Sequence, residues 1–217
     1  MDIIKNILYR DALILVLDKP AGIAVHTANG GLNNLERHFP ALQFGLPNPP
    51  TLGHRLDLGT SGCLVLARHR QAAQRLRVLF SENRIKKTYW AIAAGDFPQD
   101  EGRIDIPLSK QSTSKRHWWM KADPEGDVSA ITDYRVLGRG NGLTWLELSP
   151  QTGRTHQLRI VQPLVIPSSV IIFMALREKH LPKTNCTFTP GPLKFPSIPK
   201  RPPFTLKPPP HLICKKP

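Results

Sequence analysis

The chain has 217 residues, of which 30 are Lys or Arg and 16 are Asp or Glu, giving a formal charge of +14 and an isoelectric point near 10.2. This length fits one domain with a sizeable core, and no run of 18 apolar residues predicts a membrane span. Three widely spaced cysteines lack metal-ligand spacing and indicate reduced thiols in a cytoplasmic protein. The positive charge favours a polyanionic partner such as nucleic acid, although a basic surface can also serve solubility alone.

The apolar pattern of residues 1–160 predicts a single α+β domain. In chain order, we expect strands at residues 13–17, 63–68, 87–93, 130–137, 143–148 and 155–160, and helices near residues 32–38 and over 71–82. The last two strands flank a turn at residues 149–153, which predicts a hairpin. Because strands outnumber helices, the pattern favours a mixed, mostly antiparallel central sheet with flanking helices.

Residues 161–217 differ from the rest of the chain. They hold 13 of the 22 prolines and nine basic residues against one acidic residue. Closely spaced prolines are incompatible with a helix interior or a central strand. We therefore expect a basic, irregular and disordered tail after a domain over residues 1–160.

The stretch His54–Gly62, HRLDLGTSG, places one carboxylate in a glycine-rich turn. Leu52 precedes it, and an apolar run over residues 63–67 follows, so Asp57 is expected between the end of one strand and the start of the next. An isolated Asp-x-Gly is often only a turn former.

The whole segment, however, resembles the H-R-L-D-x-x-T-S-G motif of the RluA-type pseudouridine synthases. Three further segments resemble motifs of the same family in the same order: residues 15–22 (V-x-x-K-P-x-G), 86–91 (K-x-Y-x-A) and 153–159 (G-R-T-H-Q-[LI]-R). The resemblance covers about residues 7–160. It implies the α+β pseudouridine synthase fold and the isomerisation of a uridine in structured ribosomal or transfer RNA. It also implies that neither a cofactor nor a metal is needed, and we expect a monomer that does not bind membranes.

The resemblance assigns catalytic roles to three residues. Asp57 is expected to be the nucleophile, acting on a flipped-out base, since a carboxylate can attack the sugar or remove a proton from it. Tyr89 is expected to stack on the uracil, although an isolated strand tyrosine is often a core residue. Arg159 is expected to pair with Asp57 and keep it ionised; the alternative is a surface arginine.

Other residues of these motifs are candidates for RNA binding. Arg55 is expected to occupy the space left by the flipped base, and further RNA contacts are expected from His54, Thr60, Lys87 and Arg154. His156 is expected to be structural, as is the turn at residues 18–22. The basic and aromatic segment at residues 110–121 is compatible with an RNA-contacting hairpin or with a solvated loop.

Two other functions are alternatives to the synthase. A glycosidase or nuclease that used Asp57 would require a second carboxylate or a metal site, and neither is visible near it. A metal site made by His54 and Asp57 lacks a third ligand. The second alternative is an inactive or unstable remnant that at most binds RNA.

The tail has a more specific interpretation. If the codons of residues 164–175 are read one base earlier, synonymous choices permit Gly-His-Pro-Ile-Ile-Gly-Asp-His-Leu-Tyr-Gly, which resembles the family's G-H-P-I-x-G-D-x-x-Y-G. The same offset over residues 185–199 permits a strand that resembles the family's L-H-L-H-A. We therefore predict that the reading frame shifts near Ile160, through a translation artefact or a damaged gene; the alternative is a lineage-specific basic tail.

Overall fold

The computed structural model describes residues 2–26, 34–114, 117–158 and 172–177. Its helices are one α-helix, α1 (Arg70–Ser81), and two 3-10 helices, η1 (Ile3–Asn6) and η2 (Leu35–Leu42). Its strands are β1 (Ile7–Arg10), β2 (Ile14–Lys19), β3 (Thr51–Leu52), β4 (Thr60–Ala67), β5 (Lys86–Ala94), β6 (Glu101–Asp105), β7 (Leu108–Ser114), β8 (His117–Ala122), β9 (Ile131–Gly140), β10 (Leu143–Pro150) and β11 (Ile172–Arg177).

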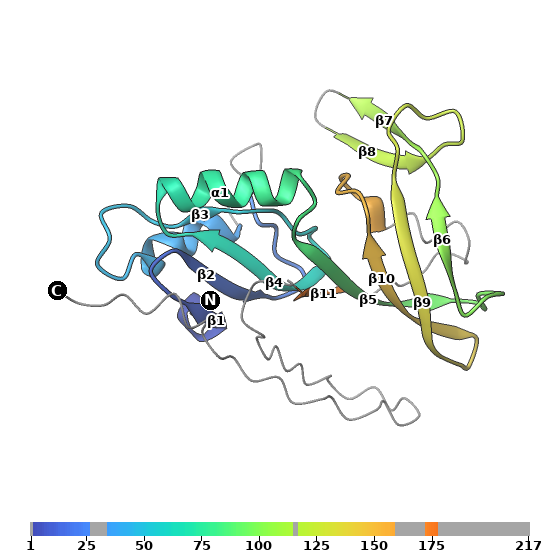
Figure 1. Ribbon diagram of the computed structural model, residues 1–217, viewed down its shortest axis with the longest axis horizontal. Coiled ribbons are helices and arrows are strands. Elements are labelled where there is room, and N and C mark those ends of the chain that lie inside the picture. The colour runs from blue at the N-terminus through green and yellow to red at the C-terminus, as the bar shows by residue number, and fades with distance from the viewer. Residues whose placement is uncertain (1, 27–33, 115–116, 159–171, 178–217) are drawn as a thin grey trace.

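Nine strands form one sheet in the order β1-β2-β4-β11-β5-β10-β9-β6, with β3 also paired to β4 (Figure 1). Every pairing in this sheet is antiparallel except that of β11 with β4. The expected mixed, mostly antiparallel sheet is therefore confirmed. Strands β7 and β8 pair separately as a hairpin.

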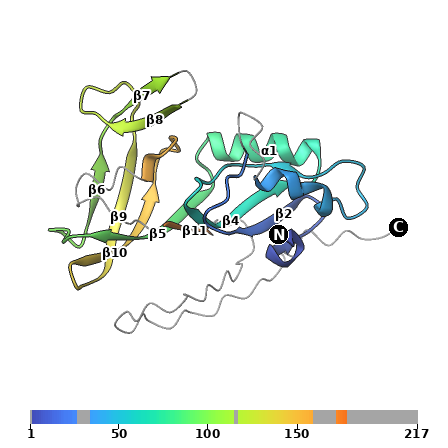
Figure 2. The same ribbon diagram turned by 180° about the vertical axis from the view of Figure 1, so that it is seen from behind.

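The sheet has two halves, which Figures 1 and 2 show on either side of β11. We call β1, β2, β3 and β4 with their helices the N-terminal half, and β5, β10, β9 and β6 the C-terminal half. Within the described residues, β11 is the only strand that bonds to both β4 and β5. It lies inside the segment expected to be irregular, so that expectation is wrong for residues 172–177. The remainder of the tail lies outside the described residues.

Strand β4 is the centre of the N-terminal half, because its apolar residues are covered on both faces. Leu64 and Leu66 pack with β2 and η2, whereas Val65 and Ala67 pack under α1. A continuous apolar run is typical of a strand that is buried on both sides. The α1 helix presents Ala72, Ala73 and Leu76 to β4 and its arginines to solvent.

The hairpin at the end of the C-terminal half differs from the predicted one. Strand β10 pairs with β9 through a tight turn at Asn141 and Gly142, whose φ angles are 53° and 69°. Two positive φ angles suit Asn-Gly in a hairpin turn, a signal that the sequence contains. The strand predicted at residues 155–160 is wrong where it is described, since residues 155–156 form a turn and residues 157–158 are 3-10 helical.

Four hydrogen bonds of one side chain explain why the chain turns there. The Gln157 side chain accepts hydrogen bonds from the Arg154 N–H at 2.9 Å and the Thr152 hydroxyl at 2.8 Å. It donates to the Ile131 carbonyl at 2.9 Å and to Thr132 Oγ1 at 3.0 Å. These bonds satisfy a 5 % exposed amide and tie the turn to β9 in place of a new strand. The helix expected near residues 32–38 is the 3-10 helix η2 where it is described.

Candidate active site

The loop that carries Asp57 links β3 to β4, which confirms the position expected from the sequence. Its backbone closes a turn in which the Thr60 N–H donates to the Asp57 carbonyl at 3.1 Å. Leu56 is 6 % exposed and packs into the main core, while Asp57 is half-buried. The apolar neighbour therefore anchors the loop and leaves the carboxylate at its outer side.

A second loop, from Lys19 to Gly22, holds the Asp57 loop in place. The buried Lys19 ammonium donates to the carbonyls of Thr60 at 2.8 Å, Pro20 at 2.9 Å and Leu58 at 3.3 Å. The Gly22 N–H donates to the same Leu58 carbonyl at 2.8 Å, from a backbone with φ of 84° that favours glycine. The K-P-x-G turn thus fixes two carbonyls of the loop that directly follow Asp57.

Lys19 also contributes electrostatically to the site. Burial lowers its pKa to about 8, and the negative charge of Asp57 opposes that shift. The sequence assigned this turn only a structural role, although the V-x-x-K-P-x-G motif could have indicated that its lysine reaches the active loop.

Tyr89, on β5, comes from the other half of the sheet. It is 8 % exposed and shares the main core with Leu56. Burial raises its pKa, and the nearby charge of Asp57 raises it further. Tyr89 therefore lies within reach of the charge of Asp57, and its phenol stays protonated.

His54 is engaged with the protein itself. Its Nε2 accepts a hydrogen bond from the Val65 N–H at 3.0 Å, and its ring lies 4.6 Å from that of Phe80. Burial lowers its pKa to about 4, so the ring is neutral at pH 7. These contacts favour a role in anchoring the loop to β4 and α1 over the expected RNA contact.

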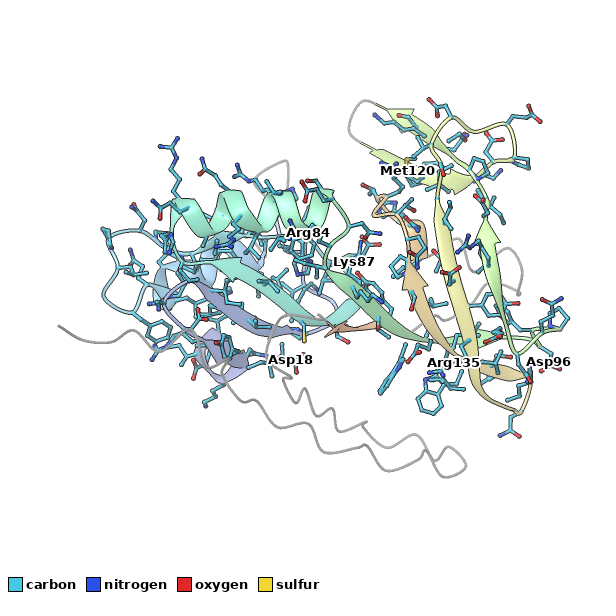
Figure 3. All side chains as sticks on the ribbon, in the orientation of Figure 1. Asp18, Arg84, Lys87, Asp96, Met120 and Arg135 are labelled. Carbon is cyan, nitrogen blue, oxygen red and sulfur yellow. The ribbon has the colours of Figure 1, made fainter. Side chains whose placement is uncertain are left out.

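The other expected RNA-binding residues occupy three kinds of position. Arg55 is exposed, whereas Thr60 is 4 % exposed and therefore shapes the loop. Lys87, labelled in Figure 3, is half-buried, and its pKa is lowered by burial. A Cβ added to Gly153 would lie 3.4 Å from its ammonium. Arg154 is exposed and donates to the Ser129 carbonyl at 3.1 Å.

Some predicted features fall outside this geometry. Arg159, the expected partner of Asp57, lies outside the described residues. His156, expected on a strand, has a φ of 59° and lies in a turn. The segment at residues 110–121 belongs to the β7–β8 hairpin, where Trp119 is 43 % exposed.

Over residues 2–26, 34–114, 117–158 and 172–177, no three His, Cys, Asp or Glu side chains are grouped in a way that could hold a metal ion. No helix in the described part of the chain is long and apolar enough to cross a membrane.

Comparison with known proteins agrees with this geometry. The family described as RNA pseudouridylate synthase matches residues 13–162. An uncharacterised RNA pseudouridine synthase of Zymomonas mobilis is 42% identical over 72% of this chain and 71% of its own length. The dual-specificity RNA pseudouridine synthase RluA of Yersinia pestis is 37% identical over 71% of this chain and 73% of its own.

A solved structure supports the fold. The human RNA pseudouridylate synthase domain-containing protein 1 aligns with a TM-score of 0.65 and 26% identity over 86% of this chain and 83% of that one. Several other relatives are longer, and the chain spans about half of their length. Because a family match covers residues 13–162 and the motifs form one site, this chain belongs to the RluA-type RNA pseudouridine synthase family.

Proposed function

We propose that this protein converts a specific uridine of structured ribosomal or transfer RNA to pseudouridine, with Asp57 as the nucleophile. The observation that carries the proposal is that the charge of Asp57 reaches both Lys19 and Tyr89 in a family-typical fold, although the three residues come from separate motifs. The relatives are named RNA pseudouridine synthases, and the basic composition suits an RNA partner.

The reaction balances without a cofactor. The Asp57 carboxylate bonds to C1′ while the N1–C1′ bond breaks and its electron pair leaves with the uracil. The ring then turns, C5 bonds to C1′, and the carboxylate is displaced. C5 releases its proton to solvent and N1 gains one, so the product is an isomer of the substrate. Removal of a sugar proton by Asp57 is the other mechanism open to the same carboxylate.

The remaining residues bind and orient the nucleotide. The target base leaves its stack, at a cost of about a few kcal/mol, to reach Asp57. Tyr89 stacks on the uracil, and Arg55 enters the space that the base vacates. Lys87 and Arg154 are exposed enough to contact phosphate, and Arg159 is assigned as the ion-pair partner of Asp57. Trp119 on the β7–β8 hairpin is available for stacking on RNA, and a solvated loop is the alternative.

Asp57→Asn tests the proposal, because it removes the nucleophile at nearly constant shape. Release of tritium from 5-tritiated uridine in ribosomal and transfer RNA transcripts reports the loss of the C5 proton. We expect the rate to fall at least about a thousandfold. Asp133→Asn is the matched control, since this carboxylate pairs with Arg103 in the C-terminal half. A rate within about tenfold of wild type for Asp57→Asn would contradict the nucleophile role.

The alternative function is an inactive or unstable remnant that at most binds RNA. It is favoured by one observation: the link between the two halves is β11, a strand from the Pro-rich tail. Without a strand there, β4 and β5 would each expose an unpaired edge. A cooperative thermal unfolding transition of the purified chain counts against an unstable remnant.

The proposal includes a shifted reading frame from near Ile160. The family match ends at residue 162, which is where the composition changes. Sequencing genomic DNA across the codons for Leu158 to Ala175 tests it. A missing or extra base is expected; a confirmed frame indicates a decayed gene, and a shifted frame full of stop codons would contradict the frame shift altogether.

The cellular setting belongs to the same proposal. We assign the protein to the cytoplasm as a monomer that uses no small-molecule cofactor. Its described cysteine, Cys63, is a buried thiol, in keeping with a reducing compartment. Sedimentation of the purified chain tests the monomer, and cell fractionation tests the location.

A further inference from the structure

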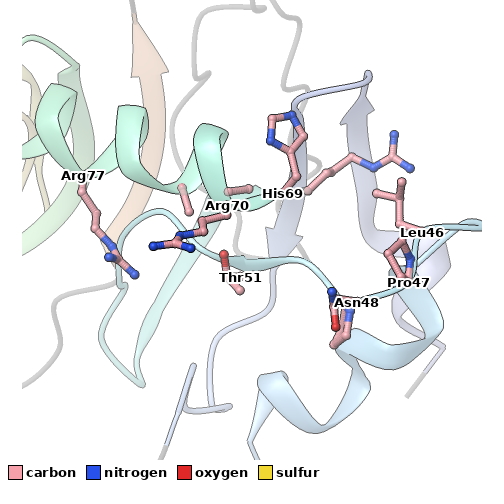
Figure 4. A pocket seen from close by; sticks show the side chains of 11 residues that line it. Leu46, Pro47, Asn48, Thr51, His69, Arg70 and Arg77 are labelled. Atoms are coloured by element: carbon pink, nitrogen blue, oxygen red, sulfur yellow. The ribbon is translucent and has the colours of Figure 1, made fainter.

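A groove with a volume of about 350 Å³ lies between α1 and the segment that leads into β3 (Figure 4). Arg70 and Arg77 extend from the helix toward Thr51, which lies across the groove. Leu46 and Pro47 contribute apolar surface at the other end of the groove. The groove thus combines two guanidinium groups with an apolar wall.

The arginines of this helix face are not neutralised within the described part of the chain. Arg70, Arg75 and Arg77 are exposed, and no described carboxylate lies within ion-pair distance of them. The first turn of α1 contains no acidic residue. Unpaired guanidinium groups along one groove concentrate positive potential there and attract a polyanion.

The groove is separate from the catalytic loop but rigidly connected to it. Strand β4 begins at Thr60, beside Asp57, and ends at Ala67, which lines the groove. Eight strand residues span roughly 23 Å. Val65 and Leu76 pack α1 onto β4, which fixes the groove relative to the loop. A chain bound at Asp57 must therefore extend along the protein to reach the groove.

We infer that this groove binds a backbone phosphate of the RNA segment that flanks the target uridine. Arg70 and Arg77 are the phosphate ligands, and Leu46 and Pro47 contact the adjoining ribose or base. Guanidinium forks match phosphate oxygens in two-point hydrogen bonds, and most protein contacts to a nucleic acid backbone are of this kind. This inference depends on the proposed function only for the identity of the RNA.

The test compares two double variants that remove the same charge. Arg70→Gln/Arg77→Gln empties the groove of cations, and Arg103→Gln/Arg135→Gln removes arginines that are paired with Asp133 and Glu147. The probe is fluorescein-labelled oligouridylate of about 20 nucleotides, long enough to cover more than one site. Its dissociation constant is measured by anisotropy over a range of salt concentrations.

For the groove variant, we expect RNA binding to be about three- to tenfold weaker. The slope of log affinity against log salt concentration should become smaller in magnitude by about 1, while the control variant stays close to wild type. Arg70→Lys/Arg77→Lys keeps the charge and is expected to restore most of the slope, which shows that the fold is intact. Equal losses in the groove and control variants, or no loss in either, would overturn the inference. Competition by polyglutamate as strong as that by oligouridylate would instead assign the groove to an acidic protein.

The assay separates this inference from the proposed function. Pseudouridine formation at subsaturating RNA is measured for the same proteins. The control variant Arg103→Gln/Arg135→Gln is expected to keep the wild-type rate, and the groove variant is expected to lose rate in proportion to its weaker binding. If wild type forms no pseudouridine while the groove variant still shows the binding defect, the proposed activity fails and the groove inference stands.

Discussion

In the C-terminal half of the sheet the arginines face carboxylates, whereas those of α1 in the N-terminal half do not. Arg135 lies 2.8 Å from Glu147, and Arg139 lies 2.7 Å from Asp100. Arg70 and Arg77 have no such partner among the described residues. The difference indicates that carboxylates neutralise the arginines of the C-terminal half. Among the described residues, they leave the arginines of α1, in the half that carries Asp57, without ion-pair partners. Net charge alone, at +14, could not show where an RNA would bind.

The largest expected effect comes from separating the two halves at β11. Met174 pairs with Gly62 on β4 and Tyr89 on β5, so Met174→Pro removes a backbone donor from the middle of the sheet. We expect the free energy of unfolding to fall by about 3 kcal/mol or more. Chemical denaturation measures it, with Met174→Val as the control. Equal stability of the two variants would show that β11 does not join the halves of the chain as written.

The next effect concerns the loop of the N-terminal half. Lys19→Met leaves the carbonyls of Leu58 and Thr60 without their ammonium donor, so we expect kcat to fall about a hundredfold while KM for RNA changes little. Lys5→Met, at an exposed lysine, is the control. A higher KM for RNA with an unchanged kcat would indicate that Lys19 binds RNA and does not position Asp57.

Lys19 also predicts a pH dependence of stability. Its pKa of about 8 in the folded protein lies below the ordinary 10.5, so the unfolded chain binds more protons between these values. The contribution of Lys19 to the free energy of unfolding therefore rises with pH across that window. The difference in stability between wild type and Lys19→Met, measured from pH 7 to 10, should shift in favour of wild type; a constant difference contradicts the lowered pKa.

A smaller effect is expected in acid, through His54. Its pKa of about 4 lies below the ordinary 6.5, so the stability due to the neutral ring is complete above pH 6.5 and is lost as pH falls toward 4. We expect wild type to lose about 2 kcal/mol more than His54→Gln between these values. Phe80→Leu removes the ring that packs on His54, so this variant should also lose less stability in acid than wild type does. If the free energy of unfolding changes with pH in the same way for all three proteins, His54 does not contribute to the acid sensitivity.

The smallest effect sharpens the contrast in charge between the halves. A double-mutant cycle on Arg135 and Glu147 should give a coupling free energy of about 0.5 kcal/mol, because the pair is partly exposed. Arg77→Gln, which breaks no described ion pair, should leave the free energy of unfolding nearly unchanged. A large destabilisation by Arg77→Gln would mean that this arginine supports the fold and is not free to bind RNA.

Much of the N-terminal half could be predicted from its sequence, because local patterns determine it. The apolar runs gave β2 and β4, the helical spacing gave α1, and the H-R-L-D motif placed Asp57 between two strands. The C-terminal hairpin was misplaced because the turn at residues 149–153 was preferred over Asn141-Gly142, where the sheet turns.

Two features of the site could not be predicted from local sequence. The contacts of Lys19 with Leu58 and Thr60 cross about 40 residues of chain, and only folding brings them together. The position of β11 between β4 and β5 depends on pairing with two distant strands, and its Pro-rich surroundings gave the opposite indication. Long-range contacts of this kind decide the active-site geometry more than the motifs do.

Direct detection of pseudouridine in unmodified ribosomal and transfer RNA transcripts, after incubation with the purified wild-type chain, tests the central claim most simply. We predict conversion of a specific uridine in one of these RNAs, at a rate that Asp57→Asn abolishes. RNA that is bound by a cooperatively folded chain but contains no pseudouridine would contradict the claim and identify the protein as a remnant that only binds RNA.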